Sequence, residues 1–193
     1  MRTRVPIIIA LALLCFTPQA CKRASDPKHL YSLDSMMVIT DSLRRAVMAI
    51  DMPGLLAIDS IYRGKRDSIL DLMNDTLQKR DAIAIGNFHR AMNGSMIRVK
   101  RDHDAVNAAL TSTSKQLIDL RHDVDHGLLP PEQERANIYQ EGLFVTQQMH
   151  ATDMLCGSAE NVQRNWRMYH EHVDSLLHAP RNLSIEGMIP KTK

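Results

Sequence analysis

The chain has 193 residues, of which 44% are hydrophobic, and it carries 24 basic and 22 acidic side chains. This length and apolar content predict one globular domain with a real core and exclude a disordered chain. The sequence contains one Trp, four Tyr and three Phe and no basic block, so it lacks the charge and the stacking residues typical of nucleic-acid binding. We therefore expect no nucleic-acid partner.

Residues 1–20 have the composition of an export signal. Two arginines precede an apolar run over residues 5–16, which is too short for a membrane-spanning helix of about 20 residues. Ala20 then precedes Cys21, and bacterial lipoproteins are cleaved before a cysteine that is afterwards acylated. We predict lipidation of Cys21 and an exported protein anchored by lipid in the cell envelope, at the outer membrane or a periplasmic face. Secretion without lipid and an uncleaved anchor are the alternatives.

Removal of the signal changes the charge and the cysteine inventory. Two arginines are lost, so 22 of the 24 basic residues remain against 22 acidic ones and the formal charge becomes zero. If Cys21 is acylated, Cys156 has no disulfide partner and packs as a small hydrophobic residue, whereas an unmodified Cys21 would allow a bridge. We expect a tether over residues 21–29, a helical domain over residues 30–178 and a flexible tail over residues 179–193.

Two shorter helices are predicted first, from His29 to Ile50 and from Gly54 to Met73. Pro53 marks the boundary between them, since proline is tolerated in a first helical turn. The inward side chains recur at helical spacings, at Leu33, Met36, Leu43, Val47 and Ile50 in the first helix and at Leu55, Ile58, Tyr62, Ile69 and Met73 in the second. We expect the two helices to be antiparallel to each other.

A longer helix is predicted over residues 81–126. Asn93-Gly94-Ser95 is a candidate interruption, because a central glycine costs about 1 kcal/mol relative to alanine. The stripe that predicts this helix repeats every seven residues, at Ile85, Met92, Val99, Val106, Thr113 and Leu120, with a second series at Met96, His103, Leu110, Leu117 and Val124.

Gly127 and Pro131 predict a reversal into a second long helix that ends near His178, with a kink at Gly157-Ser158. At 1.5 Å per residue, each long helix would span roughly 65 to 70 Å. The predicted fold is all-α: an elongated antiparallel helical bundle, in which a long helical hairpin carries two shorter helices along part of its length. The inward face of the last helix is predicted at Ile138, Val145, Met149, Leu155, Val162, Trp166, Tyr169, Val173 and Leu176.

The register of the hairpin brings several histidine, methionine and aromatic residues together. A soft-metal site for copper or zinc is one interpretation, with His89, Met92, Met96 and His170 as ligands. The other interpretation is an aromatic core layer with histidines hydrogen-bonded at its edge, because aromatics at helical spacing normally pack; its members would be Phe88, His89, Met92, Trp166, Tyr169 and His170. No other cofactor is expected.

Two further histidines, His122 and His126, are spaced by four residues near the predicted helix end. We interpret them as an exposed helix terminus, because a pair supplies only two metal ligands and protonated histidine favours the helix dipole there. The chain has no nucleophile elbow and no glycine-rich phosphate loop. We therefore predict a protein without enzymatic activity.

A short pattern of Asp, a hydroxyl residue and an aliphatic residue occurs six times. Amphipathic helix patterning explains it, with Asp and Ser outside and the aliphatic residue inside. The pattern also resembles the O-glycosylation sequon of exported Bacteroidota proteins, which implies candidate modification sites at Ser35, Ser42, Ser60, Ser68, Thr76 and Ser175.

The signal with its cysteine, the six-fold pattern, and the stretch 115–124 before a Gly-Leu-Leu turn resemble those of small helical lipoproteins of Bacteroidota. That resemblance implies no catalytic residues. A shorter resemblance links residues 129–133, Leu-Pro-Pro-Glu-Gln, to the Leu-Thr-x-x-Gln box of periplasmic helical-hairpin chaperones of the Spy and CpxP type, although a proline stands in place of the threonine.

The function predicted from these features is that of a membrane-tethered, non-catalytic helical lipoprotein of the cell envelope. Its partners would be the membrane, through the lipid, and another envelope protein or a second copy of the chain. The tether, the long apolar stripes and the lack of a reactive constellation favour this interpretation. Periplasmic handling of copper or zinc and a Spy-like chaperone function are the alternatives.

Overall fold

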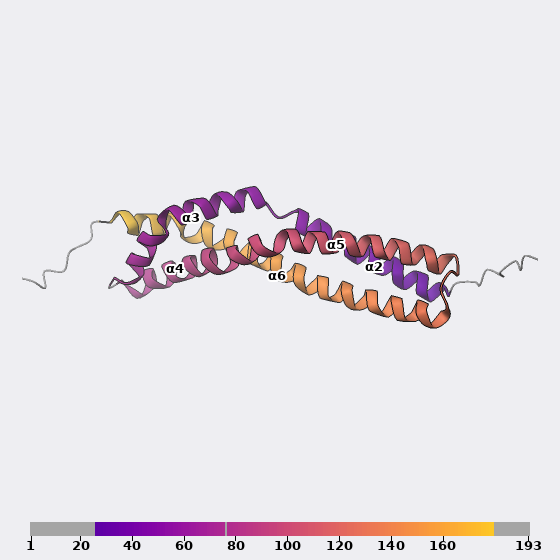
Figure 1. Ribbon diagram of the computed structural model, residues 1–193. Helices are drawn as coiled ribbons and strands as arrows, with labels where there is room; N and C mark the ends of the chain where they lie inside the picture. Colours follow the sequence, from indigo (N-terminus) through magenta and orange to yellow (C-terminus); the bar gives the residue numbers. More distant parts are fainter. Residues whose placement is uncertain (1–25, 76, 180–193) are drawn as a thin grey trace, which may run out of the picture.

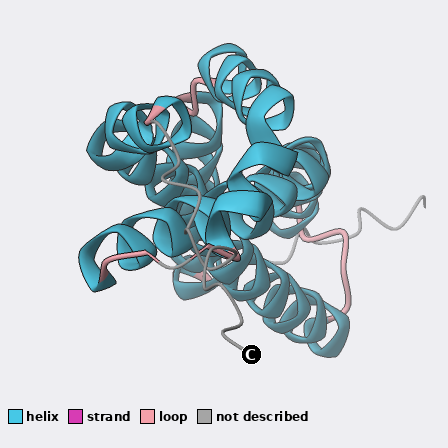
Figure 2. Cartoon of the chain, turned by 90° about the vertical axis from the view of Figure 1, so that its left-hand side faces the viewer, coloured by secondary structure: helices cyan, strands magenta, loops and turns pink. Residues whose placement is uncertain are grey.

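The computed structural model describes residues 26–75 and 77–179 of the chain. Over these residues it contains helices and short connections and no strand, which confirms the all-α prediction (Figures 1 and 2). The elements in chain order are α2 (Pro27–Met48), α3 (Met52–Met73), α4 (Lys79–Arg90), a π-helical segment η2 (Ala91–Ser95), α5 (Met96–Asp125) and α6 (Pro131–His178).

The helices form an elongated antiparallel bundle (Figure 1). α4, η2 and α5 follow one another along one path, and α6 returns beside them, so the predicted long hairpin is present. α6 alone has 48 residues, which corresponds to about 70 Å of helix. α2 lies on the half of the hairpin that contains the α5–α6 turn, and α3 lies on the other half.

The arrangement of α2 and α3 differs from the sequence prediction. They were expected to run antiparallel, but they follow one another end to end, and each packs against the long hairpin (Figure 1). The chain does not reverse between them: Ala49 remains in the right-handed helical region, and Asp51 caps α3 by accepting a hydrogen bond from Gly54 N at 3.0 Å. Each helix buries its apolar stripe against two helices of the hairpin, which covers more of that stripe than one short neighbour would.

We refer to the two ends of the molecule by the helices that build them. The N-terminal half comprises α2, most of α5 and the first part of α6. The distal half comprises α3, α4, η2 and the last part of α6. A side-chain hydrogen bond between His29 and Glu134 fastens the start of α2 to the start of α6, so α2 begins at the end of the molecule that carries the α5–α6 turn.

That turn has the geometry expected of its glycine. Gly127 has φ of 61°, and it is the one residue with a left-handed backbone in the described part of the chain. Leu128 N donates to Asp123 O and Gly127 N donates to Val124 O, which is the pair of bonds of a Schellman motif. Pro131 then occupies the first turn of α6, as predicted.

The two proposed interruptions of the long helices have different outcomes. Residues 91–95 do not break the path but adopt a π-helical turn, which includes Asn93 and Gly94. Asn161 Nδ2 donates to Ser95 Oγ at 2.8 Å and ties this turn to α6. Gly157-Ser158 causes no interruption in α6, and Ser158 Oγ donates back to Met154 O at 2.7 Å within the helix.

The buried side chains form two hydrophobic clusters of unequal size. The larger has 17 buried residues and extends from the distal end through the middle, with Leu55, Ile85 and Leu155 among its most buried members. The smaller has five buried residues, Leu33, Leu117, Leu120, Val124 and Val145, and lies in the N-terminal half. The seven-residue stripe predicted for residues 85–120 is buried at every position.

Some predicted inward positions are wrong, and on α6 the reason is visible in the buried residues. Met73 and Met149 were expected inside but are 43% and 42% exposed, while Leu72 and Thr152 are buried. On α6 the buried series runs through polar or small side chains, including Thr152, Ser158 and Ala159. A stripe traced through large apolar residues alone therefore drifts off the true face.

Several predictions fall outside the described residues. These are the signal over residues 1–20, Cys21, Thr76 and the tail beyond residue 179. α2 begins at Pro27, inside the segment 21–29 that was expected to be a tether. The helix starts there because Asp26 accepts a hydrogen bond from Lys28 N at 2.9 Å and Pro27 is suited to a first turn.

Candidate functional site

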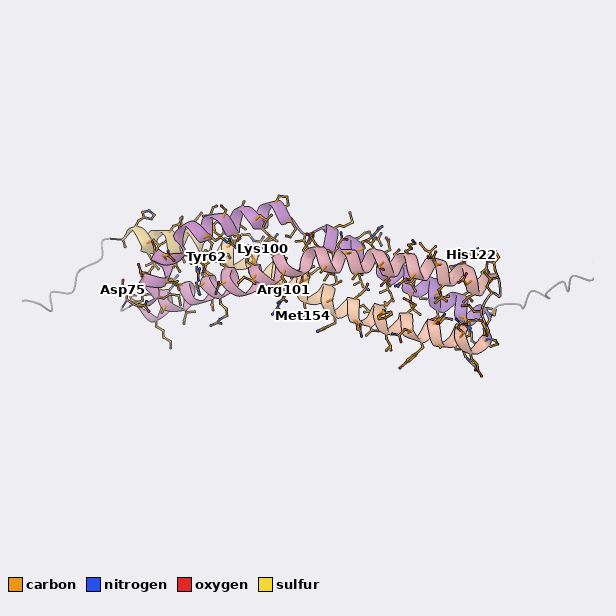
Figure 3. The ribbon with its side chains drawn as sticks, in the orientation of Figure 1. Tyr62, Asp75, Lys100, Arg101, His122 and Met154 are labelled. Atoms are coloured by element: carbon orange, nitrogen blue, oxygen red, sulfur yellow. The ribbon has the colours of Figure 1, made fainter. Side chains whose placement is uncertain are left out.

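Two hollows in the surface of the distal half are lined by described residues. We call the first the α3 groove, which has a volume of about 590 Å³ and lies between α3 and the π-helical turn. Its lining residues are Asp59, Tyr62, Arg63, Arg66, Asp67, Met92, Asn93 and Ile97. Figure 3 labels Tyr62 in this half and His122 at the opposite end of the molecule.

A hydrogen bond at the edge of the α3 groove joins α3 to α4. Tyr62 Oη and His89 Nδ1 lie 2.8 Å apart. Burial raises the pKa of Tyr62, and Arg66 opposes that shift in part. Burial also lowers the pKa of His89, and the positive charge of Arg66 lowers it further. Both groups are therefore neutral at neutral pH, and the bond joins a phenol to an uncharged imidazole.

Tyr62 also belongs to a series of ring contacts across the distal half. Its ring centroid lies 6.0 Å from His89 and 6.1 Å from Phe88, and Phe88 lies 5.9 Å from Trp166. Trp166 stacks on His170 at 4.7 Å. The predicted contact between Phe88 and Trp166 is present, and Tyr62 of α3 joins the layer although the sequence did not predict it. His89 and His170 lie at opposite ends of this series.

A buried carboxylate forms the floor of the same groove. Asp59 is 8% exposed and accepts a hydrogen bond from Lys100 Nζ at 2.7 Å, and Arg63 Nε lies 3.0 Å from the same carboxylate oxygen. Figure 3 labels Lys100 below α3, to the right of Tyr62. The cations neutralise Asp59, so it serves as a link between α3 and α5 and supplies no free base.

The residues predicted as metal ligands have other surroundings in the structure. Met92 and Met96 are 1% and 0% exposed and belong to the larger hydrophobic cluster. His89 Nδ1 is bonded to Tyr62, and His170 Nδ1 donates to Trp166 O at 2.7 Å. Within residues 26–75 and 77–179, no three or more His, Cys, Asp and Glu side chains are arranged to hold a metal ion. The His and Met site stays a prediction that a titration with copper or zinc tests.

The histidine pair on the α5 end adopts a local arrangement. The rings of His122 and His126 stack with centroids 4.1 Å apart, and His126 Nδ1 donates to His122 O at 2.8 Å. His122 is exposed, in agreement with the interpretation of a helix terminus.

The six hydroxyl residues of the repeated pattern are spread over three helices and one undescribed position. Ser42, Ser60, Ser68 and Ser175 are exposed, and Thr76 is outside the described residues. Ser35 is half-buried, and its hydroxyl donates to Tyr31 O at 2.8 Å. Modification at these positions stays a prediction.

The second hollow, which we call the basic groove, runs along α4 and between α4 and α6. It consists of three adjoining parts that share lining residues, with volumes of about 680, 350 and 380 Å³. Its apolar floor is formed by Ile83, Ala84, Met168 and Tyr169. His172 Nε2 and Asp81 Oδ1 share a hydrogen bond of 2.9 Å across the end of this groove.

The charge of the basic groove has one sign. Lys79, Arg80, Arg90 and Arg164 line its three parts, and no Asp or Glu does. The α3 groove, by contrast, balances two arginines with two aspartates. The two hollows therefore favour different ligands although both lie in the distal half.

Sequence analysis missed both hollows, for different reasons. The contact of Tyr62 with His89 depends on how α4 packs beside α3 after the connection between them. The periodicity of neither helix determines that packing. The basic groove did have a signal, since Lys79, Ile83 and Arg90 are spaced by four and seven residues and so share one face of α4. That signal was overlooked because α4 was treated as part of one long apolar stripe.

Comparison of the chain with protein-family models, with curated proteins and with solved structures finds no match. Among the helices of the described part, none combines the length and the apolar character that crossing a bilayer requires.

Proposed function

We propose that this chain is a non-catalytic, membrane-tethered helical module of the cell envelope, which binds another envelope protein or a second copy of itself through its distal half. The predicted export signal over residues 1–20 and the cysteine that follows it support the tether. The observation that carries the proposal is that α2 begins at one end of an elongated bundle, while the α3 groove and the basic groove lie toward the other end.

The length of the bundle separates the predicted lipid anchor from the two grooves. Helix α6 corresponds to about 70 Å, so a lipid attached before α2 would leave the distal half tens of ångströms from the membrane surface. A tether at one end and hollows at the other suit a module that reaches a partner away from the membrane. Tyr62 and Asp59 of the α3 groove are held in hydrogen bonds to His89 and Lys100, which supports a binding role over a catalytic one.

The anchor is tested by fractionation of cells that express the full chain. We expect the protein in the membrane fraction with a blocked N-terminus, and we expect Cys21→Ser to move it to the soluble fraction, because single acyl chains bind weakly and stable anchoring needs several. Intact mass also shows whether any glycan is present. A mature protein that begins with an unmodified Cys21 would contradict the anchor.

The binding end is tested by photo-crosslinking in the same cells. A photoreactive phenylalanine analogue at position 168 probes the distal half, and one at position 118 is the control, since Met168 and Ile118 are similarly exposed at 60% and 51%. We expect a discrete protein adduct from position 168 and none from position 118. Equal adducts from both positions, or none from either, would contradict a binding site in the distal half.

A further inference from the structure

The basic groove has the dimensions of a site for a protein segment. Its three parts are continuous, because the first two share Lys79 and Ile83, the second and third share Asn87 and Arg90, and the first and third share Met168. The shared residues on α4 extend from Lys79 to Arg90, which is about 18 Å of helix. About three turns of a second helix would match that length.

The floor of the groove is apolar and accessible. Ile83 and Met168 are 53% and 60% exposed, and they are adjacent to the partly buried ring of Tyr169. Large aliphatic side chains that remain this exposed beside a hollow can bury more surface only by contact with another molecule. Methionine also adapts its shape to a bound side chain.

The rim of the groove selects for negative charge. Within the described residues, Lys79, Arg80 and Arg90 form no ion pair, and Arg164 donates to an amide oxygen, that of Asn161, at 3.0 Å. Asp81, two residues after Lys79 on α4, is bonded to His172. The rim therefore presents four cations whose charge is not balanced in the groove, and electrostatic complementarity favours an acidic ligand.

The charge also disfavours the C-terminal residues of the chain as the occupant. Residues 180–193 come after α6 in the sequence, and they contain three basic residues and one acidic residue. Their side chains thus carry the same sign as the rim. A flat anionic bilayer matches the charge but not the concave shape of the groove.

We propose that the basic groove binds an acidic amphipathic helix of a partner protein, with aliphatic side chains of that helix on Ile83 and Met168 and its carboxylates on the cations of the rim. This inference rests on the proposed function, because it names the partner chemistry for the distal half. Helix-in-groove binding of this kind places anchors at i, i+3 or i+4, and i+7.

The test uses the full chain in nanodiscs of zwitterionic lipid and a fluorescent synthetic peptide. The peptide has leucine at i, i+3 and i+7 and glutamate at the flanking positions, and a second peptide has lysine in place of each glutamate. We expect saturable binding of the acidic peptide in fluorescence anisotropy, weakening as salt is raised, and no binding of the lysine peptide. No saturation at about 1 mM acidic peptide, or equal binding of the two, would overturn the inference.

Charge-reversal variants locate the site. Arg80→Glu with Arg90→Glu should weaken binding by at least about tenfold, since it replaces attraction with repulsion at the rim. The control is Lys115→Glu with Arg135→Glu, which makes the same change in net charge at exposed positions of the N-terminal half. Equal weakening in both variants would show non-specific attraction and overturn the inference. Circular dichroism confirms that the variants, all at exposed positions, remain folded.

Two further outcomes separate this inference from the proposed function. If vesicles containing phosphatidylglycerol bind the full chain as strongly as the acidic peptide does, the groove serves a membrane surface and the inference fails. If position 168 crosslinks to a protein in cells while the acidic peptide does not bind, the inference fails and the proposed function stands. If position 168 crosslinks to no protein and the acidic peptide does not bind, the inference and the proposed function both fail.

Discussion

The two halves of this molecule bury polar groups in different ways. In the distal half, Asp59 is neutralised by Lys100 and Arg63, and Tyr62 is bonded to His89. In the N-terminal half and the adjoining middle, four buried oxygen atoms have no hydrogen-bond partner within the described residues; they belong to Thr40, Glu141, Gln148 and Thr152. The polar groups that hold the shape of the distal half are thus paired with one another. In the N-terminal half and the adjoining middle, buried polar atoms without partners lower the stability of the fold.

The threonines show where these costs arise. Thr40, Thr113 and Thr152 each occupy a seven-residue position that is otherwise apolar, one on each of α2, α5 and α6, and they are 1–3% exposed. Thr113 alone has a partner, since Gln148 Nε2 donates to its Oγ1 at 2.6 Å. A buried hydroxyl at a core position can help to specify the register of the helices. It lowers stability relative to an apolar side chain when it has no hydrogen-bond partner.

The largest expected effect on the free energy of unfolding comes from the same substitution, Leu→Ala, made in each of the two hydrophobic clusters. Leu155→Ala in the larger cluster and Leu33→Ala in the smaller cluster remove the same atoms from side chains that are 1% and 0% exposed. We expect a loss near 5 kcal/mol for Leu155→Ala and near 2 kcal/mol for Leu33→Ala, in the range of about 2 to 5 kcal/mol for such changes, because a small cluster near the end of the bundle collapses more easily. Urea unfolding measures both, and equal losses would contradict the difference in packing.

The next effect concerns the contact that fastens the start of α2. His29→Ala should destabilise the fold by about 1 to 3 kcal/mol, because it removes the imidazole that faces the 3%-exposed Glu134. The control is Tyr31→Ala, which changes a side chain that is 76% exposed two residues away and should have little effect. Hydrogen exchange of the first turns of α2 reports the change locally. Unaltered exchange in the His29 variant would show that α2 is held by its apolar stripe alone.

The threonines allow a sharper test at smaller magnitude. Thr40→Val and Thr152→Val should each raise the free energy of unfolding by about 1 kcal/mol, because each removes a buried hydroxyl that has no partner. Thr113→Val should lower it by about the same amount, because Gln148 then loses the acceptor of its shorter hydrogen bond and keeps only Ala109 O at 3.4 Å. Chemical denaturation of the three variants checks the signs. A loss of stability in Thr40→Val would contradict the account of unpaired groups in this half.

The smallest effect is an opposite response of the two halves to acid. The pKa of His89 is lowered from 6.5, so its stabilising effect is complete above that pH and is lost as the pH falls through the folded-state value. Burial raises the pKa of Glu141 above 4.5, so its destabilising effect is present at neutral pH, is lost as the pH falls through the raised folded-state pKa, and is absent below 4.5. His89→Asn should therefore flatten the loss of stability below pH 6.5, whereas Glu141→Gln should stabilise at pH 7 and have no effect below pH 4.5. Unfolding midpoints across this range test both signs.

The sequence predicted those parts of the structure that depend on local pattern. The hairpin, the Gly127 turn and the buried stripe from Ile85 to Leu120 follow from seven-residue spacing and from glycine and proline chemistry. The end-to-end placement of α2 and α3 does not follow from these patterns. Whether the two helices pack against each other or against the hairpin depends on how much apolar surface each arrangement buries. Helix propensity also could not predict the π-helical turn at residues 91–95. The low propensity of Asn93 and Gly94 indicates a weak point in the helix, but it does not determine the geometry adopted there.

The central claim is that the hollows lie far from the end where α2 begins, and a distance between two spin labels tests it most directly. Cysteines introduced at Leu128, in the turn beside the start of α2, and at Lys79, on the rim of the basic groove, are both at exposed positions, with Cys156 replaced by serine. The account predicts a single distance near 60 Å, since about 40 residues of continuous α6 separate the levels of these two sites. A distance below about 35 Å would mean that the helices fold back on themselves, and the separation of tether and grooves would be wrong.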